Sequence, residues 1–147
     1  MIIFLDIDGV LKPHSKRYDL DLDPQNSLDS DCIKYLNEIT DFDFCEIVVS
    51  STWRRMEYCR QILKKAGMNA NFHKIWKTPS DISIPINNPI RTSEISAWLQ
   101  INNKNNTPYI ILDDDIISDP LAKRHVPVNP HTGLTSISVN SAINLFE

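Results

Sequence analysis

The 147-residue sequence predicts an α/β fold in which a parallel sheet lies between two layers of helices. Short uninterrupted apolar runs recur along the chain, and such runs are typical of strands buried on both faces. Segments with apolar residues at helical spacing separate these runs, and this alternation indicates a parallel sheet covered by helices. The length fits one domain with a core of its own, so we expect residues 1–147 to form a single domain.

Residues 2–7 predict the first strand. Asp6, Asp8 and Gly9 stand at its carboxyl end, and ligands bind at that edge in open α/β sheets. A strand followed by an ordinary turn would give the same local pattern, because Asp and Gly favour turns. The ends of the later strands decide between these two interpretations.

Residues 12–28 predict a loop or short flap over this edge, since they are too polar to form a domain of their own. The segment is first basic and then acidic. It is either a solvated loop or a basic lip that meets an anionic substrate. The basic residues considered for the lip are Lys12, His14, Lys16 and Arg17, with Arg54, Arg55 and Arg60 from a later segment.

A helix is expected from Ser27 or Asp29 to about Thr40, followed by a β-branched strand over residues 45–49. The hydroxyls of residues 50–52 come next. Hydroxyl and amide groups just before a helix can bind an anion.

The remaining elements follow the same alternation. We expect a helix from residue 53 to about Ala66, irregular chain over 68–90 with a short strand at 75–76, and a helix from Thr92 or Ser93 through Leu99. A strand over 109–112, a strand over 124–128 and a closing helix from Ser136 or Ser138 complete the prediction.

Three strand ends therefore carry groups suited to a phosphate or a metal, and Asp113, Asp114 and Asp115 form the third set. Clustered carboxylates repel one another unless a cation lies among them. Oxygen ligands in an open site suit Mg²⁺, which also accepts phosphate oxygens. A fixed positive charge is needed as well. Arg91 is favoured over Lys77 for it, because Arg91 begins the helix before the third acidic strand.

Four segments together resemble the motifs of the haloacid dehalogenase (HAD) superfamily of phosphohydrolases. Residues 6–10 resemble the first motif, and the strand end at residues 51–52 resembles the second. Arg91 stands where the family has Lys or Arg, most often Lys, and residues 112–114 resemble the fourth motif. The resemblance implies a Rossmann-like, HAD-type three-layer sandwich with a minimal flap and no large cap domain.

A finer pattern resembles the small HAD domains of Swiss Army knife RNA repair proteins. It comprises Ser50-Ser51-Thr52-Trp53-Arg54, Glu94-Ile95 with Trp98-Leu99, the three consecutive aspartates and Gly133-Leu134-Thr135.

The superfamily resemblance implies a Mg²⁺-dependent phosphatase that works through an aspartyl-phosphate. Asp6 would attack phosphorus, and Asp8 would act as general acid and base. Arg91 would stabilise the developing charge. Ser51 would bind a phosphoryl oxygen, with Ser50 as the alternative. The further substrate-binding residues are Thr52, Arg54 and Gly9, and the metal-binding residues are Asp6, Asp8, Asp113 and Asp114. The order of importance between Asp113 and Asp114 stays open.

The short flap predicts an open site, which suits a terminal phosphate on a nucleotide or a nucleic acid. Two other functions remain: a HAD-fold binding or regulatory module without turnover, and a receiver-like domain that accepts a phosphoryl group. A receiver places its acceptor alone on a middle strand, unlike the Asp6 and Asp8 pair here.

The bulk properties limit the partners and the location. The net charge of −4 gives no global case for nucleic-acid binding, although a local basic patch is compatible with it. No apolar run reaches the length of a membrane span, and no signal peptide is expected. Three cysteines without metal-ligand spacing indicate reduced thiols and a cytoplasmic protein. No obligate protein partner is inferred.

Overall fold

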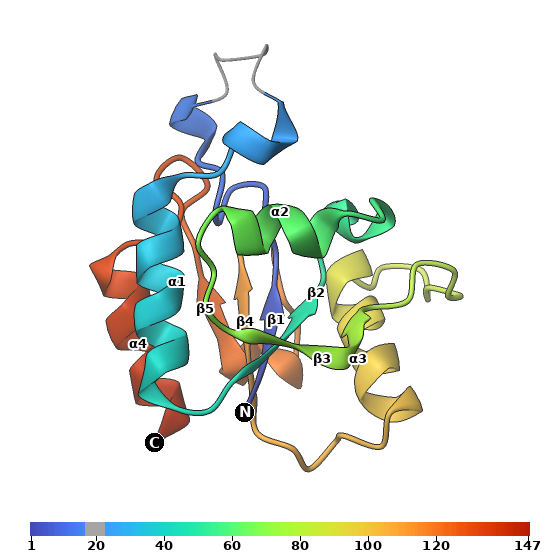
Figure 1. Ribbon diagram of the computed structural model, residues 1–147. Coiled ribbons are helices and arrows are strands. Elements are labelled where there is room, and N and C mark those ends of the chain that lie inside the picture. Colours follow the sequence, from blue (N-terminus) through green and yellow to red (C-terminus); the bar gives the residue numbers. More distant parts are fainter. Residues whose placement is uncertain (17–22) are drawn as a thin grey trace.

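The computed structural model describes residues 1–16 and 23–147, which contain a five-stranded parallel sheet in the order β3-β2-β1-β4-β5 (Figure 1). All four strand pairings are parallel. The α/β fold class predicted from the sequence is confirmed. The strands are β1 (Ile2–Leu5), β2 (Glu46–Val49), β3 (Asn71–Lys77), β4 (Tyr109–Asp113) and β5 (His125–Pro127).

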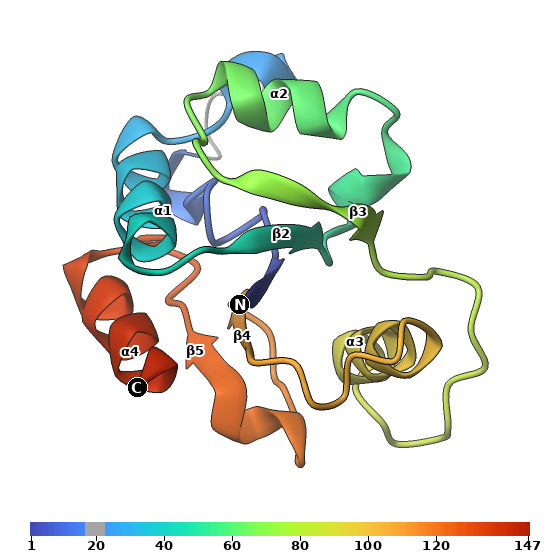
Figure 2. The same cartoon turned by 60° about the horizontal axis from the view of Figure 1, so that its bottom comes forward.

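Helices cover both faces of the sheet. They are α1 (Ser30–Phe42), α2 (Cys59–Lys65), α3 (Ile90–Ile101) and α4 (Ser136–Phe146). One core cluster contains buried residues of α1, α2 and α4, and a second contains those of α3. Figure 2 shows α3 on the other side of the sheet from α2. The layers are therefore helix, sheet and helix, as in a HAD-type sandwich, with no large cap in the described part of the chain.

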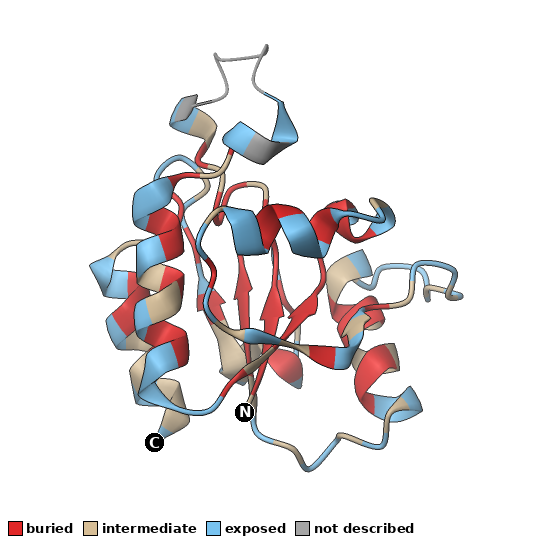
Figure 3. Cartoon of the chain, in the orientation of Figure 1, coloured by how far each residue is buried: buried red, intermediate tan, exposed pale blue. Residues whose placement is uncertain are grey.

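The central strand β1 is buried along its whole length (Figure 3). In β1, Ile3 and Leu5 belong to the core under α1, whereas Ile2 and Phe4 belong to the core under α3. Side chains alternate along a strand, so Asp6 continues the face that looks toward α3. The apolar run of β1 thus positions the first carboxylate as well as the core.

The edge strand β3 is longer than the two residues predicted for it. It runs over seven residues, Asn71–Lys77, and pairs with β2 through an irregular register. Most of its side chains are exposed or partly exposed, and β3 lies at the edge of the described sheet. An edge strand of this kind lacks the continuous apolar pattern that identifies a buried strand.

The prediction of a helix from residue 53 to about Ala66 is wrong for its first residues. A 3₁₀ turn occupies Thr52–Arg55, and α2 begins only at Cys59. Arg54 explains this break. Its side chain is buried and donates hydrogen bonds to the carbonyl oxygens of Ser51 and Thr78, which holds the chain in a tight turn. The C-cap of α2 is Ala66 rather than Gly67, which the sequence favoured; Gly67 follows it with a φ of 108°.

The helix starts differ partly from the expected ones. Asp29, rather than Ser27, caps α1 by accepting a hydrogen bond from the amide of Cys32. α3 begins at Ile90, directly after Pro89, so Thr92 lies inside the helix and is no cap. The Thr92 hydroxyl instead accepts a hydrogen bond from the amide of Ser118. α4 begins at Ser136 after a capping box.

Of the flap, Arg17 and the side chain of Lys16 lie outside the described part of the chain. No helix within residues 1–16 and 23–147 is long and apolar enough to cross a membrane.

Gly133 supports the loop that follows β1. The neighbouring Leu134 amide donates a hydrogen bond to the carbonyl oxygen of Val10. Gly133 has a φ of +67°, and a Cβ atom there would lie 2.7 Å from both Val10 O and Cys32 Sγ. Only a residue without a side chain fits this close approach.

We therefore expect Gly133→Ala to lower the free energy of unfolding by about 2–4 kcal/mol, combining left-handed backbone strain with overpacking. Gly67→Ala is the matched control. It also introduces backbone strain, since Gly67 has a φ of +108°, but its Cβ would meet only Ile33 Cγ2, at 3.6 Å. Urea unfolding measures both, and equal losses would show that the contact with Val10 does not matter.

Candidate active site

Three strands bring polar side chains together at the carboxyl edge of the sheet, which is uppermost in Figure 1. Leu5 of β1 lies opposite Val49 of β2 and Leu112 of β4. The next residues continue this ladder, since the Asp6 amide donates to Leu112 O and the Ser50 amide donates to Leu5 O. Asp6, Ser50 and Asp113 consequently stand side by side on the face toward α3.

Arg91 lies between two buried carboxylates of this row. Its Nη2 is 3.3 Å from Asp6 Oδ1, and its Nε is 2.9 Å from Asp113 Oδ2. The first turn of α3 carries Arg91 into this position. Lys77, the alternative cation, lies instead with its Nζ 5.3 Å from the ring centre of Trp76. Arg91 is therefore the cation that the fold places at Asp6.

A third acidic residue, Glu94, also contacts Arg91. Glu94 Oε2 is 3.7 Å from Arg91 Nη1, and Glu94 Oε1 accepts a hydrogen bond of 2.9 Å from Arg54 Nη2. Glu94 and Arg54 are both buried. A chain of alternating charges thus runs from Asp6 through Arg91 and Glu94 to Arg54, and each charge in it faces an opposite one.

This arrangement corrects the role expected for Arg54. Besides Glu94, its guanidinium group binds the carbonyl oxygens of Ser50, Ser51 and Thr78. Only 3% of the residue is exposed, and its donors are used within the protein. We therefore no longer expect Arg54 to bind substrate at this site.

Burial dominates the acid–base properties of the site. It raises the pKa of Asp6 from 3.8 to about 8, and repulsion from Asp113 adds to this effect while Arg91 opposes it. Burial also raises the pKa of Asp113, again against the influence of Arg91. One cation does not fully balance these carboxylates.

A divalent cation fits the same cluster. Asp6, Asp113 and Asp114 each offer one carboxylate oxygen, and these oxygens lie within 4.8 Å of one another. A set made only of carboxylates suits Mg²⁺, and the positive charge would relieve the repulsion that raises the pKa of Asp6.

The structure distinguishes Asp113 from Asp114. Asp113 is fully buried, accepts a hydrogen bond from the Asp115 amide and pairs with Arg91. Asp114 is partly exposed and lines the cavity above the cluster. The geometry favours Asp114 as the metal ligand on the open side, with Asp113 as the buried ligand beneath it.

Gly9 makes room for Asp114. Its φ is +80°, and a Cβ atom at this position would lie 2.5 Å from Asp114 Oδ2 and 3.0 Å from Pro130 Cβ. The sequence predicted Gly9 as a substrate-binding residue with space beside it. The structure shows that a metal-ligand candidate occupies that space.

Asp8 lies outside the three-carboxylate cluster. Its Oδ2 accepts a hydrogen bond of 3.2 Å from the indole Nε1 of Trp53. Trp53 itself is buried. Its contact with Asp8 was missed, because no spacing in the sequence connects two residues 45 positions apart.

The hydroxyls after β2 have different surroundings. Ser51 is buried and its Oγ accepts a hydrogen bond from the Trp53 amide, which caps the 3₁₀ turn. Thr52 is exposed and lines the cavity. The buried Oγ of Ser50 has no hydrogen-bond partner in the described part of the chain. Thr52 thus faces the opening, while Ser50 has an unused hydroxyl on the face of Asp6.

A cavity of about 290 Å³ opens over these groups. Two of its lining residues are His14, which the sequence offered for the basic lip, and Asp115, the last of the three consecutive aspartates. The lining residues are Asp6, Asp8, His14, Thr52, Arg91, Asp114 and Asp115.

Comparison with known families agrees with this geometry. A family model described as "HAD domain in Swiss Army Knife RNA repair proteins" matches residues 2–139. The match includes every residue of the site described above, and it confirms the resemblance that the motifs suggested. No curated protein and no solved structure matches the chain at a significant level.

Gly9→Ala should weaken Mg²⁺ binding by about tenfold or more, because the added methyl group displaces the Asp114 carboxylate. Titration calorimetry measures the affinity. Gly67→Ala, which is strained in the same way but remote, should bind Mg²⁺ like the wild type. An unchanged affinity in Gly9→Ala would show that Asp114 is not a ligand.

The raised pKa of Asp6 predicts how stability depends on pH. Without Mg²⁺, the free energy of unfolding should fall as the pH rises from about 4 to about 8. Folded Asp6 retains a proton over this range, whereas the unfolded chain, with the ordinary pKa of 3.8, has released it. Saturating Mg²⁺ should reduce the fall, because the cation favours the ionised carboxylate.

Urea unfolding across this pH range, with and without Mg²⁺, measures the effect. Asp6→Asn should reduce the slope because it removes the group that retains the proton. Identical slopes with and without Mg²⁺ would contradict the assignment of the cluster to the metal.

Proposed function

This chain belongs to the family of HAD domains in Swiss Army knife RNA repair proteins, and on that premise we propose that it is a Mg²⁺-dependent phosphatase. HAD domains are generally hydrolases and typically use Mg²⁺. The observation that carries the proposal is the buried Asp6 carboxylate, held by Arg91 and flanked by further carboxylates beneath an open cavity.

Asp6 is the proposed nucleophile. One of its carboxylate oxygens attacks phosphorus, the bond from phosphorus to the leaving oxygen breaks, and an aspartyl-phosphate forms. Arg91 keeps the Asp6 carboxylate in place, since its Nη2 lies 3.3 Å from Oδ1. The same guanidinium group stabilises negative charge as it develops on the phosphoryl oxygens.

Asp8 is the proposed general acid and base. In the first step it gives a proton to the leaving oxygen. In the second step it takes a proton from water, which attacks phosphorus, breaks the bond to Asp6 and releases inorganic phosphate. The Trp53 indole fixes the Asp8 carboxylate outside the metal cluster, and this separation lets the two aspartates perform different tasks.

Asp6, Asp114 and Asp113 are the side chains proposed to hold Mg²⁺, and the family resemblance adds the backbone carbonyl of Asp8. A cation held by these residues would neutralise charge on the nucleophile and on the phosphate. Ser51 remains the hydroxyl proposed for a phosphoryl oxygen, because it accepts from the Trp53 amide and keeps its own proton to donate. Ser50 is the alternative, and Thr52 lines the cavity.

The proposed substrate is a terminal phosphate on a nucleotide or a nucleic acid. The cavity is open, and no large cap covers it in the described part of the chain. The RNA repair proteins named in the family description act in a nucleic-acid context. A cytoplasmic location is part of this proposal, and the buried thiols of Cys45 and Cys59 support it.

Phosphate release from p-nitrophenyl phosphate, nucleoside 5′- and 3′-monophosphates and oligonucleotides phosphorylated at either end tests the proposal. The wild type should release phosphate only with Mg²⁺, and Asp6→Asn should lower kcat by about 10⁴-fold or more. Asp41→Asn, an exposed change near the end of α1, should keep wild-type activity.

Absence of Mg²⁺-dependent release from every substrate would favour a binding or regulatory module. Equal activity of Asp6→Asn and the wild type would exclude Asp6 as the nucleophile.

A further inference from the structure

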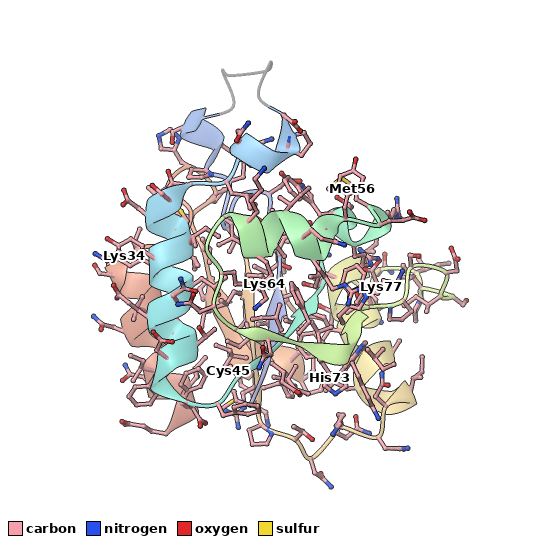
Figure 4. All side chains as sticks on the ribbon, viewed as in Figure 1. Lys34, Cys45, Met56, Lys64, His73 and Lys77 are labelled. Carbon is pink, nitrogen blue, oxygen red and sulfur yellow. The ribbon has the colours of Figure 1, made fainter. Side chains whose placement is uncertain are left out.

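A strongly basic surface lies on α2 and β3, outside the cavity. Residues 58–80 carry five Lys or Arg residues and no Asp or Glu, although the whole chain has a net charge of −4. We use the term α2–β3 surface for the basic residues Arg60, Lys64, Lys74 and Lys77 and the two aromatic residues Phe72 and Trp76. Figure 4 shows Lys64 and Lys77 on this side of the molecule and Lys34 apart from them on α1.

Aromatic rings hold the cations of this surface. Arg60 Cζ lies 4.8 Å from the ring centre of Trp76, and Lys77 Nζ lies 5.3 Å from the same ring. Lys64 Nζ lies 5.8 Å from the ring centre of Phe72. The two rings are themselves in contact, with centres 6.4 Å apart. These contacts keep positive charges close to partly exposed aromatic faces.

The charges of these cations are not neutralised by carboxylates. Among the described residues, Arg60, Lys64 and Lys77 form no ion pair with Asp or Glu, and all three are exposed. A surface with fixed, unneutralised cations beside aromatic rings suits a partner that has both negative charge and flat apolar groups.

The α2–β3 surface is continuous with the site. β3 ends at Lys77, and the next amide, of Thr78, donates a hydrogen bond to Val49 O at the carboxyl edge of β2. The 3₁₀ turn Thr52–Arg55 connects the two regions. Thr52, at the start of this turn, lines the site cavity, while Arg55, at its end, lines a second cavity of about 360 Å³ together with Lys77.

We propose that the α2–β3 surface binds single-stranded nucleic acid, so that the strand runs from β3 past Arg55 and brings its terminal phosphate to Asp6. Backbone phosphates pair with Arg60 and Lys77, and bases stack on Trp76 and Phe72. This inference rests on the proposed phosphatase function for the strand end, but binding of the strand can be measured without turnover. An acidic peptide would use the charges and leave the rings unused.

Arg60→Gln with Lys77→Gln tests the surface by removing the two cations on Trp76. Fluorescence anisotropy measures binding of a short, end-phosphorylated RNA or DNA strand to Asp6→Asn protein, in which turnover is blocked. We expect the double change to raise the Kd about tenfold and to lower the slope of log K against log salt by about 1.4, since each phosphate contact contributes about 0.7.

Lys34→Gln with Lys123→Gln is the matched control. It removes the same charge from exposed residues of other faces and should leave the Kd and salt slope close to those of the parent. Equal losses of affinity for the strand in the two double variants would overturn the proposal, because binding would then follow net charge alone.

Trp76 gives an independent measurement. Trp53 and Trp98 are buried, so Trp76 is the tryptophan at this surface. The strand should quench tryptophan fluorescence, Trp76→Phe should lose most of the quenching, and Trp76→Leu should also weaken binding. Two results would contradict the proposal and support an acidic-peptide surface instead. One is that poly-glutamate of equal charge displaces the strand, and the other is that the strand leaves Trp76 fluorescence unquenched.

Kinetics then separate the two hypotheses. In active protein, Arg60→Gln with Lys77→Gln should lower kcat/KM for an end-phosphorylated oligonucleotide about tenfold relative to that for p-nitrophenyl phosphate. If the wild type binds strands but releases no phosphate, the proposed function fails and the surface remains. If the wild type releases phosphate, but the double variant has an unchanged ratio of kcat/KM for the oligonucleotide to kcat/KM for p-nitrophenyl phosphate, the surface fails and the function remains.

Discussion

The guanidinium group of Arg91, held between the buried carboxylates of Asp6 and Asp113, is the contact on which the site depends. Burying an unpaired charge costs roughly several kcal/mol of folding free energy, so the carboxylates at these strand ends need a cation. Arg91 supplies one positive charge, and Glu94 holds Arg91 in place. The raised pKa of Asp6 indicates that further positive charge would be accommodated.

The fold provides this contact through three separate elements. β1 and β4 are neighbours in the sheet, so their ends place Asp6 beside Asp113. α3 lies on the face toward which both side chains point, and its first turn delivers Arg91. In the order β3-β2-β1-β4-β5, the chain adds β2 and β3 on one side of β1 and then β4 and β5 on the other side. Doubly wound sheets bind their ligands at such a switch point, between β1 and β4 here.

The parts of this account that the sequence could predict depend on local pattern. The apolar run of β1 and its Asp6-Ile7-Asp8-Gly9 ending were sufficient to locate the central strand and the nucleophile candidate. The contacts of Trp53 with Asp8 and of Arg54 with Glu94 join residues 45 and 40 positions apart, so no local pattern could reveal them. β3 was underestimated because an exposed edge strand lacks a continuous apolar run.

Isolation of the covalent intermediate tests the central claim most directly. Wild-type protein is mixed with Mg²⁺ and p-nitrophenyl phosphate, quenched in acid during turnover, and mapped by peptide mass spectrometry. The arrangement of Arg91, Asp6 and Asp8 predicts one phosphoryl group on Asp6 and none on Asp8. Turnover that leaves Asp6 unmodified, with the phosphoryl group on another residue, would contradict the assignment of Asp6 as the nucleophile.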